Sequence, residues 1–223
     1  MLTTAFCQGE ILLSHKSTNL LIVQTVLPVI ICAALLLQGC AITNSPGFHS
    51  GYKKLPATER EKIRFIPANQ AIPAAGGRLI YAVNAGSLLN AMQPGDSTLV
   101  YVWAPHCHGN NCASIQSVQD ICHQKGYQLY VVAEYFADME QINLQPTLDK
   151  PLLAINYPVY KTDYCPKYTS LFEAELRQEQ PLPEHLKYAR FFLFKGRQFV
   201  KAIDTLQGTK PQFLPTLTLR KRS

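Results

Sequence analysis

The sequence lacks the features of several common protein classes. Its 21 Lys and Arg residues are scattered, apart from the tail Arg220-Lys221-Arg222, and no basic stripe interleaves with aromatic residues. This pattern argues against nucleic acid as a partner, and we interpret the basic tail as solvated. No internal repeat and no low-complexity block occurs, so the chain is not a repeat array. With 47% hydrophobic and 10% aromatic residues among 223, it can form the core of one ordinary domain with appendages.

Charge is missing altogether from one long stretch near the N-terminus. Residues 20–37 read LLIVQTVLPVIICAALLL, and Gln38-Gly39-Cys40 follows them. An apolar run of about 18 to 20 residues can cross a bilayer. Preceded by His15 and Lys16, it also fits a secretory signal. Two interpretations are open: an uncleaved transmembrane anchor with an incidental cysteine, or a signal peptide over residues 1–39.

The four residues Leu37-Gln38-Gly39-Cys40 resemble the lipobox of bacterial lipoproteins, although Gln38 is a less usual choice at its position. The resemblance implies cleavage before Cys40, diacylglycerol on the Cys40 thiol, and an acylated new amino terminus. Acyl chains such as palmitate anchor a protein stably when there are two or three of them, because each buried methylene contributes about 0.8 kcal/mol. We therefore expect a lipoprotein of the cell envelope, held on the lipid bilayer through Cys40, with its domain outside the cytoplasm. Ala41 after the cysteine favours the outer membrane in a cell with two membranes.

Residues 40–78 are rich in proline and glycine, which predicts a tether behind the lipidated cysteine, with one short ordered piece at Ala57–Phe65. A regular hydrophobic pattern begins at Leu79, which predicts a domain over residues 79–223. Outside the cytoplasm, the cysteines of this domain lie in an oxidising compartment, where disulfides are permitted but not compulsory.

The pattern of this domain is that of an α/β fold. Ser97–Trp103 and Tyr127–Tyr135 predict buried strands, because both are rich in β-branched and aromatic residues. A helix between them is predicted to begin at an Asn111 N-cap and to end at Lys125-Gly126. Strand, helix and strand with short connections imply a parallel pair with a right-handed crossover.

Further elements flank this unit. Four are predicted: a strand at Leu79–Val83, a short helix from Ser87 through Met92, a short strand at Leu152–Ile155, and a helix from a capping box at Ser170–Glu173 through Gln178. Residues 189–204 predict a β-hairpin that turns at Lys195-Gly196-Arg197. All of these elements can share one mixed central sheet with helices on both faces.

The segment VYVWAPHCHGNNC, Val100–Cys112, places a cysteine directly after an apolar strand. Trp-Ala-Pro-x-Cys at a strand end resembles the approach to the active site of the thioredoxin family, and FFLFKGRQFV resembles its penultimate hairpin. The resemblance covers roughly Leu79 to Leu206. It implies a thioredoxin-like three-layer fold, and it implies that Cys107 occupies the place of the attacking thiol at a helix N-terminus.

Two positions depart from the family pattern. The resolving cysteine of the family lies three residues after the first, where this chain has Asn110, and Cys112 lies five residues after Cys107. Residues five apart in one helix point about 140° away from each other. The two sulfurs can therefore meet only if the helix starts late and the loop folds back. The family's cis-proline is also missing, because Ala189-Arg190 occupies its place and a trans bond is expected there.

Three functions remain open on this sequence. The first is a non-catalytic or weakly redox-active lipoprotein, in which a Cys107–Cys112 disulfide is a local staple. The second is an envelope thiol–disulfide oxidoreductase, with Cys107 attacking and Cys112 resolving. The third is copper or zinc binding at His106, Cys107, His108 and Cys112, whose sulfur and imidazole groups suit these metals. On the first two readings no cofactor is expected.

Other residues in the domain have simpler interpretations. Cys122 lies seven residues after Ile115, which favours a buried and unreactive thiol. We place Cys165 in a loop, either free or paired with Cys122, and Trp103 in the core. Glu134 ends an apolar strand, where a solvated carboxylate is the simpler expectation and a buried acid that transfers protons at the cysteines is the alternative.

Overall fold

The computed structural model describes residues 47–68, 70–74, 79–107, 112–136 and 148–208. These residues belong to one compact unit, which spans Pro46–Ser223. The predicted signal peptide at residues 1–39 and the predicted lipidation residue Cys40 lie outside the described residues, as does His108.

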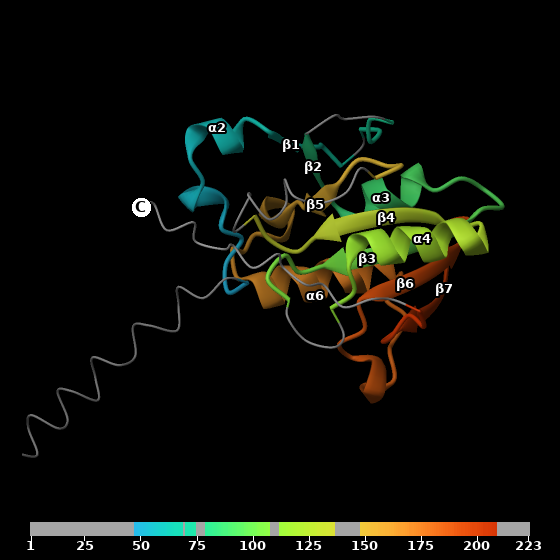
Figure 1. The fold of residues 1–223 in the computed structure, drawn as a ribbon. Helices are drawn as coiled ribbons and strands as arrows, with labels where there is room; N and C mark the ends of the chain where they lie inside the picture. The colour runs from blue at the N-terminus through green and yellow to red at the C-terminus, as the bar shows by residue number, and fades with distance from the viewer. Residues whose placement is uncertain (1–46, 69, 75–78, 108–111, 137–147, 209–223) are drawn as a thin grey trace, which may run out of the picture. The chain divides into compact units, whose positions relative to one another are not determined.

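The described residues form an α/β fold built on one mixed sheet of seven strands (Figure 1). The strands are β1 (Ile63–Phe65), β2 (Ile80–Val83), β3 (Ser97–Trp103), β4 (Gln128–Ala133), β5 (Leu153–Ile155), β6 (Phe191–Lys195) and β7 (Gln198–Ile203). Their order across the sheet is β1-β2-β5-β4-β3-β6-β7. The first five in this order run parallel, and β6 and β7 are antiparallel to their neighbours.

The centre of the sheet is made by the strands with the most apolar sequences. From Thr98 onward, every residue of β3 is buried, and β4 is buried from Leu129 onward. A parallel strand covered on both faces has such an uninterrupted apolar run. The β6–β7 hairpin turns at Gly196, whose positive φ of 56° suits glycine better than any other residue. The predicted strands at 79–83, 97–103, 127–135 and 152–155 and the predicted hairpin are therefore confirmed.

Helices cover both faces of the sheet. Among the described residues, the three longest are α3 (Ala85–Ala91), α4 (Ile115–Lys125) and α6 (Cys165–Leu176). In Figure 1, α4 lies across one face of the sheet, and α3 and α6 lie together on the other. Helix α4 ends as expected, because Gly126 adopts the left-handed conformation that closes a helix.

Two helix starts differ from the predictions. Helix α4 begins at Ile115, and its N-cap is Ser114, whose side chain accepts a hydrogen bond from the Ser117 N–H. Asn111 is therefore not the cap. Helix α6 begins at Cys165 rather than at Ser170. Proline at the first turn of a helix costs no hydrogen bond, so Pro166 starts this helix, and the apparent capping box lies inside it.

The segment before Leu79 is not simply a tether. Strand β1 pairs in parallel with β2 at the edge of the sheet, and Ile63 and Ile66 are buried in the core. Ser50 is also buried, and its N–H donates to the backbone oxygen of Asp163. The described fold extends back to Gly47 and includes the short ordered piece expected at Ala57–Phe65, which consists of α2 (Ala57–Arg60) and β1. Local glycine and proline content did not reveal pairing with a distant strand.

Among the helices in the described part of the chain, none is long and apolar enough to cross a bilayer. The apolar run at residues 20–37 lies outside that part.

Candidate functional site

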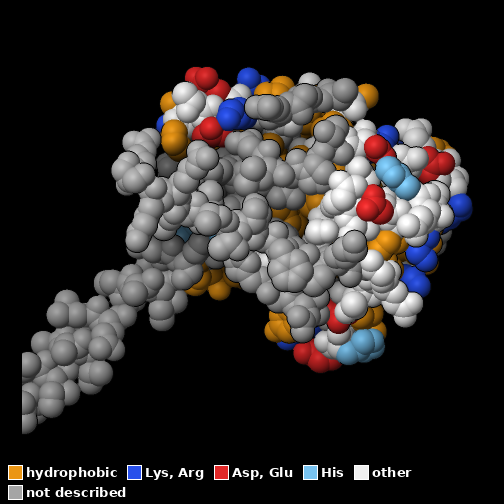
Figure 2. Space-filling view, in the orientation of Figure 1, with side chains coloured by type: hydrophobic (Ala, Val, Ile, Leu, Met, Phe, Trp, Pro, Cys, Tyr) orange, Lys and Arg blue, Asp and Glu red, His pale blue; other side chains and the backbone are white. Residues whose placement is uncertain are grey.

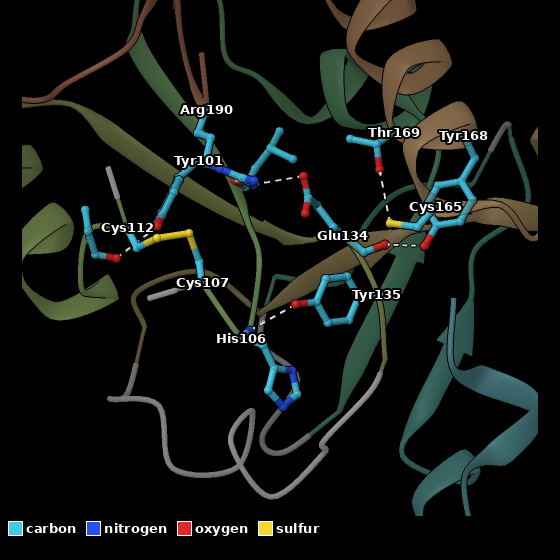
Figure 3. Close-up of polar contacts among 12 residues, drawn as sticks. Tyr101, His106, Cys107, Cys112, Glu134, Tyr135, Cys165, Tyr168, Thr169 and Arg190 are labelled. Carbon is cyan, nitrogen blue, oxygen red and sulfur yellow. Dashed lines mark hydrogen bonds and ion pairs between the residues drawn. A yellow bond between two sulfur atoms is a disulfide. The ribbon is translucent and has the colours of Figure 1, made fainter. Parts of the chain in front are cut away.

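A disulfide joins Cys107 and Cys112 where β3 ends and before α4 begins (Figure 3). The Cα atoms of the two cysteines are 5.5 Å apart, within the usual range for a disulfide. The helix starts three residues after Cys112, so neither cysteine is helical. The predicted late-starting helix is confirmed, and with it the predicted Cys107–Cys112 bond.

The two cysteines differ in how far they are buried. Cys112 is buried, whereas Cys107 is only partly buried and packs against the edge of the core. The N–H of Cys107 donates to the backbone oxygen of Ala104 at 3.1 Å, which forms a turn directly after the strand. A reagent from solvent can therefore reach the Cys107 side of the bond more easily than the Cys112 side.

Tyr101 supports the short segment between the disulfide and the helix. This residue is fully buried in β3, and its hydroxyl donates to the backbone oxygen of Ala113 at 2.9 Å. Its ring stacks on Phe191 of β6, with 4.6 Å between the ring centroids. Because the ring is held by the sheet, the hydroxyl fixes the position of the residue next to Cys112 (Figure 3).

Tyr135 supports the other side of the disulfide. Its hydroxyl accepts a hydrogen bond of 3.0 Å from the N–H of His106, the residue before Cys107. The rings of His106 and Tyr135 are nearly parallel, with centroids 6.1 Å apart. Burial raises the pKa of Tyr135 to about 12, so the phenol stays neutral at physiological pH. Two neutral tyrosines thus hold the backbone on both sides of the disulfide.

A charged pair lies beside this site. Arg190 Nη1 lies 2.9 Å from Glu134 Oε1, and the two side chains are 26% and 13% exposed. Glu134 follows β4, and Arg190 precedes β6. The same guanidinium nitrogen donates to the backbone oxygen of Val102 at 3.4 Å, so the pair is tied to the end of β3. Burial raises the pKa of Glu134, and the positive charge of Arg190 opposes this rise.

Glu134 is therefore a buried and paired acid rather than a solvated strand end. The backbone oxygen of the same residue accepts a hydrogen bond of 2.7 Å from the Tyr168 hydroxyl on α6. A second acid, Glu173 on α6, has its pKa raised to about 8 by burial and by the nearby charge of Glu134. Sequence reasoning identified Glu134 only as an alternative and missed Arg190, because the two are 56 residues apart in the chain.

The remaining two cysteines of the domain are separate from the disulfide. Cys122 is buried in α4, as predicted, and burial raises the pKa of its thiol to about 12. Cys165 is also free and buried, with its pKa raised to about 11 mainly by burial. It is the first residue of α6 and not a loop residue, and its sulfur lies 3.7 Å from the Thr169 hydroxyl. Neither thiol is a candidate for reaction at neutral pH.

The usual source of thiolate activation is weak at this site. A helix dipole acts within the first turn of the helix. Here Ser114 is the N-cap, so Cys107 lies seven residues before the cap and Cys112 lies two residues before it. Cys107 is therefore not at the helix N-terminus where the family resemblance alone would place it, and the late start of the helix is the reason. The guanidinium of Arg190, at the end of β3, is already paired with Glu134.

The predicted metal ligands do not form a site in the described residues. No group of three or more His, Cys, Asp or Glu side chains in that part of the chain could hold a metal ion. Cys107 and Cys112 are joined to each other, and a disulfide sulfur is not the thiolate that copper and zinc bind. His106 stacks on Tyr135, and His108 is outside the described residues.

No family model, no curated protein and no solved structure matches this chain.

Proposed function

We propose that this chain is a lipid-anchored, thioredoxin-like protein of the bacterial cell envelope, non-catalytic or weakly redox-active, in which the Cys107–Cys112 disulfide acts as a local staple. The observation that carries this proposal is the position of the disulfide. It closes the loop between β3 and α4, it lies outside the helix, and two buried tyrosines fix the backbone on either side of it.

The α/β architecture supports the thioredoxin-like part of the proposal. Strand β3, helix α4 and strand β4 form a parallel unit, and the β6–β7 hairpin continues the same sheet beside β3. These are the elements on which the resemblance rests. Strands β1 and β5 are additions to this set, and β5 lies between β2 and β4.

Arg190 supports the non-catalytic part of the proposal. It occupies the place of the family's cis-proline, which helps to bind the substrate backbone. The described residues contain no cis peptide bond, so the bond between Ala189 and Arg190 is trans. The Arg190 backbone oxygen also accepts a hydrogen bond of 2.9 Å from the Val102 N–H, so this oxygen is used within the sheet. A substrate chain would find a guanidinium and an occupied carbonyl at this edge.

Turnover of a model disulfide tests the non-catalytic assignment. The chain is incubated with insulin and a reductant, and precipitation of the insulin B chain is followed by turbidity. We expect no acceleration over the Cys107→Ser/Cys112→Ser variant, which is the matched control. Acceleration that is abolished by Cys107→Ser alone would contradict the staple and support exchange.

The lipid anchor is tested independently of the disulfide. The full chain is expressed in a bacterium that is fed an alkyne analogue of palmitate, and the label on the chain is detected after coupling to a dye. We expect labelling that is lost in Cys40→Ser and retained in Cys32→Ser, because only Cys40 occupies the lipobox position. An unlabelled Cys40 would support the transmembrane-anchor interpretation instead.

The unequal burial of the two cysteines favours thiol–disulfide exchange as a second candidate. An exchange enzyme needs one accessible sulfur that attacks and one protected sulfur that resolves, and Cys107 and Cys112 differ in this way. In this reading the thiolate of reduced Cys107 attacks a substrate disulfide. Cys112 then displaces the reduced substrate and restores the Cys107–Cys112 bond. A mixed disulfide trapped on Cys107 in a Cys112→Ser variant, and not on Cys112 in a Cys107→Ser variant, would support this candidate.

A further inference from the structure

The described chain begins beside the N-terminus of α6. The backbone oxygen of Phe48 accepts a hydrogen bond of 3.0 Å from the Cys165 N–H, and His49 forms an isolated bridge with Tyr164. The rings of Phe48 and Tyr164 lie edge to face with centroids 5.1 Å apart. The point where the chain enters the fold is therefore fixed on this side of the domain (Figure 1).

Apolar side chains are exposed on the same side. Tyr164 and Leu171 are both 42% exposed, although aromatic and aliphatic side chains of this size are mostly buried elsewhere in the domain. Tyr164 is the N-cap of α6, and Lys167 and Leu171 are four residues apart within the helix, so these two share one stripe that starts close to Tyr164. Exposed Val159 lies on the preceding 3₁₀ turn, Tyr157–Tyr160.

Lysines surround this stripe. Lys161 and Lys167 are exposed, and so is Lys53 on the 3₁₀ turn Tyr52–Lys54, whose Tyr52 ring lies 6.4 Å from that of Tyr157. Within the described residues, none of these three lysines forms an ion pair. The acid of the region, Asp163, is engaged by Ser50 and lies 3.9 Å from His49. We call Phe48, Lys53, Lys161, Tyr164, Lys167 and Leu171 the α6 face.

The position of Lys167 is unfavourable for the helix that carries it. Lys167 lies in the first turn of α6, and that turn contains no acidic residue. The positive end of the helix dipole repels a cation placed there. Stability of the helix therefore does not account for a lysine at this position, whereas an anionic partner that meets this face does.

We propose that the α6 face docks on the surface of an anionic lipid bilayer. This inference rests on the proposed anchoring of the chain at Cys40. Six residues separate Cys40 from Gly47, and an extended chain spans at most about 3.6 Å per residue, or roughly 20 Å in all. The α6 face is therefore the part of the domain that must lie nearest to the membrane. Tyrosine rings enter the interfacial layer of a bilayer, and lysines lie beside its anionic headgroups.

Lysine footprinting tests the docking. The full chain is purified from membranes in detergent and transferred to lipid nanodiscs, one set containing phosphatidylcholine alone and the other adding phosphatidylglycerol. A water-soluble acylating reagent then labels the lysines, and mass spectrometry gives the labelling at each. We expect labelling of Lys161 and Lys167 to fall about fivefold with phosphatidylglycerol, and to recover in high salt. Lys125 is the last residue of α4 and Lys195 the last residue of β6, so both lie outside the α6 face and their labelling should not change. Figure 2 shows Lys and Arg side chains on the side of the domain where α4 ends.

Uniform labelling of all four lysines would overturn the docking. If Lys161 and Lys167 are already protected in detergent, another part of this chain covers the α6 face. That result would also overturn the docking. A charge-matched pair of variants makes the test sharper. The readout is the labelling of the neighbouring Lys54, which should differ between the two nanodiscs in the natural chain. This difference should disappear in the triple variant Lys53→Gln/Lys161→Gln/Lys167→Gln. Lys125→Gln/Lys195→Gln/Lys201→Gln, with the same change in net charge, should keep it.

The docking and the lipid anchor can fail separately. The mass of the Cys40 peptide shows whether that cysteine is acylated, and this result is independent of the footprint. A chain that lacks acylation but shows the lysine pattern would refute the lipoprotein assignment only, because the apolar residues 20–37 would hold the same face at the bilayer. An acylated chain with uniform labelling would refute the docking only.

Discussion

Arg190 and Glu134 form an ion pair of 2.9 Å that joins three strands of the sheet beside the Cys107–Cys112 disulfide. Glu134 follows β4, Arg190 precedes β6, and the guanidinium also bonds to the backbone oxygen of Val102 in β3 (Figure 3). Removing one member of a buried pair leaves the other without compensation, which is more costly than removing both.

We therefore expect each single substitution, Arg190→Met and Glu134→Gln, to lower the free energy of unfolding by about 2–3 kcal/mol, somewhat less than for a fully buried pair. The double variant should lose less than the sum of the two. Urea unfolding followed by the fluorescence of Trp103, the single tryptophan, measures this directly. A double variant that loses the full sum would show that the two side chains do not interact.

The exposed pair Lys187–Glu184 is the matched control for this cycle. Its atoms are 3.3 Å apart, and more than half of each side chain is exposed to solvent. Exposed ion pairs contribute about 0–1 kcal/mol. Glu184→Gln should therefore leave the unfolding midpoint almost unchanged, and the coupling between Lys187 and Glu184 should be small beside that between Arg190 and Glu134.

Glu173 gives the stability of the fold a dependence on pH. Burial and the neighbouring Glu134 raise its pKa from 4.5 to about 8, while Arg177 and Arg190 oppose the rise. Between these two values the folded chain keeps a proton on Glu173 that the unfolded chain has lost. The contribution of Glu173 to the free energy of unfolding is thus fully present below about pH 4.5 and is lost as the pH rises through about 8.

The measurement is the urea midpoint at pH 5 and at pH 8, for the natural chain and for Glu173→Gln. The natural chain should lose more stability than the variant between the two pH values, because glutamine does not titrate. Glu59→Gln, at an acid that lies 2.8 Å from Lys62 and is remote from Glu134 in the sequence, serves as the control and should follow the natural chain. Parallel behaviour of the natural chain and Glu173→Gln would show that Glu173 titrates normally.

The strands were predictable from the sequence because their composition is decisive. Ser97–Trp103 contains no charge, and the predicted and observed bounds of β3 are the same. Gly126 ends α4 for a reason that is local to the chain. The segment that contains β1 was expected to be ordered, but its place at the edge of the sheet could not be predicted, because its pairing with β2 is a tertiary contact.

The candidate site was predictable only in its covalent part. The loop-forming residues between Cys107 and Cys112 indicate that two sulfurs five residues apart can meet, and they do. The pairing of Glu134 with Arg190 depends on β4 and β6 lying on either side of β3, which the sequence predicts only through the whole fold. The hydrogen bonds of Tyr101 and Tyr135 could not be predicted either, since a tyrosine in or beside a buried strand is usually expected only to pack in the core.

The Cys107–Cys112 disulfide should stabilise the fold modestly. Loop-closure entropy for a ring of this size corresponds to about 2 kcal/mol. We expect Cys107→Ser/Cys112→Ser to lower the free energy of unfolding by this amount, and a reductant to lower that of the natural chain equally. The double variant is its own control, because the reductant should not affect it further. A natural chain that is insensitive to reductant would show that the bond contributes nothing to stability.

The free thiols of Cys122 and Cys165 should be silent in the folded chain. Both are buried, and their pKa values of about 12 and about 11 leave almost no thiolate at pH 8. Since only the thiolate reacts, iodoacetamide should modify neither cysteine in the native chain and both in urea. Peptide mass spectrometry separates them from the N-terminal cysteines. Labelling of Cys165 alone in the native chain would mean that the start of α6 opens locally. Labelling of Cys122 in α4 as well would mean that the whole fold opens.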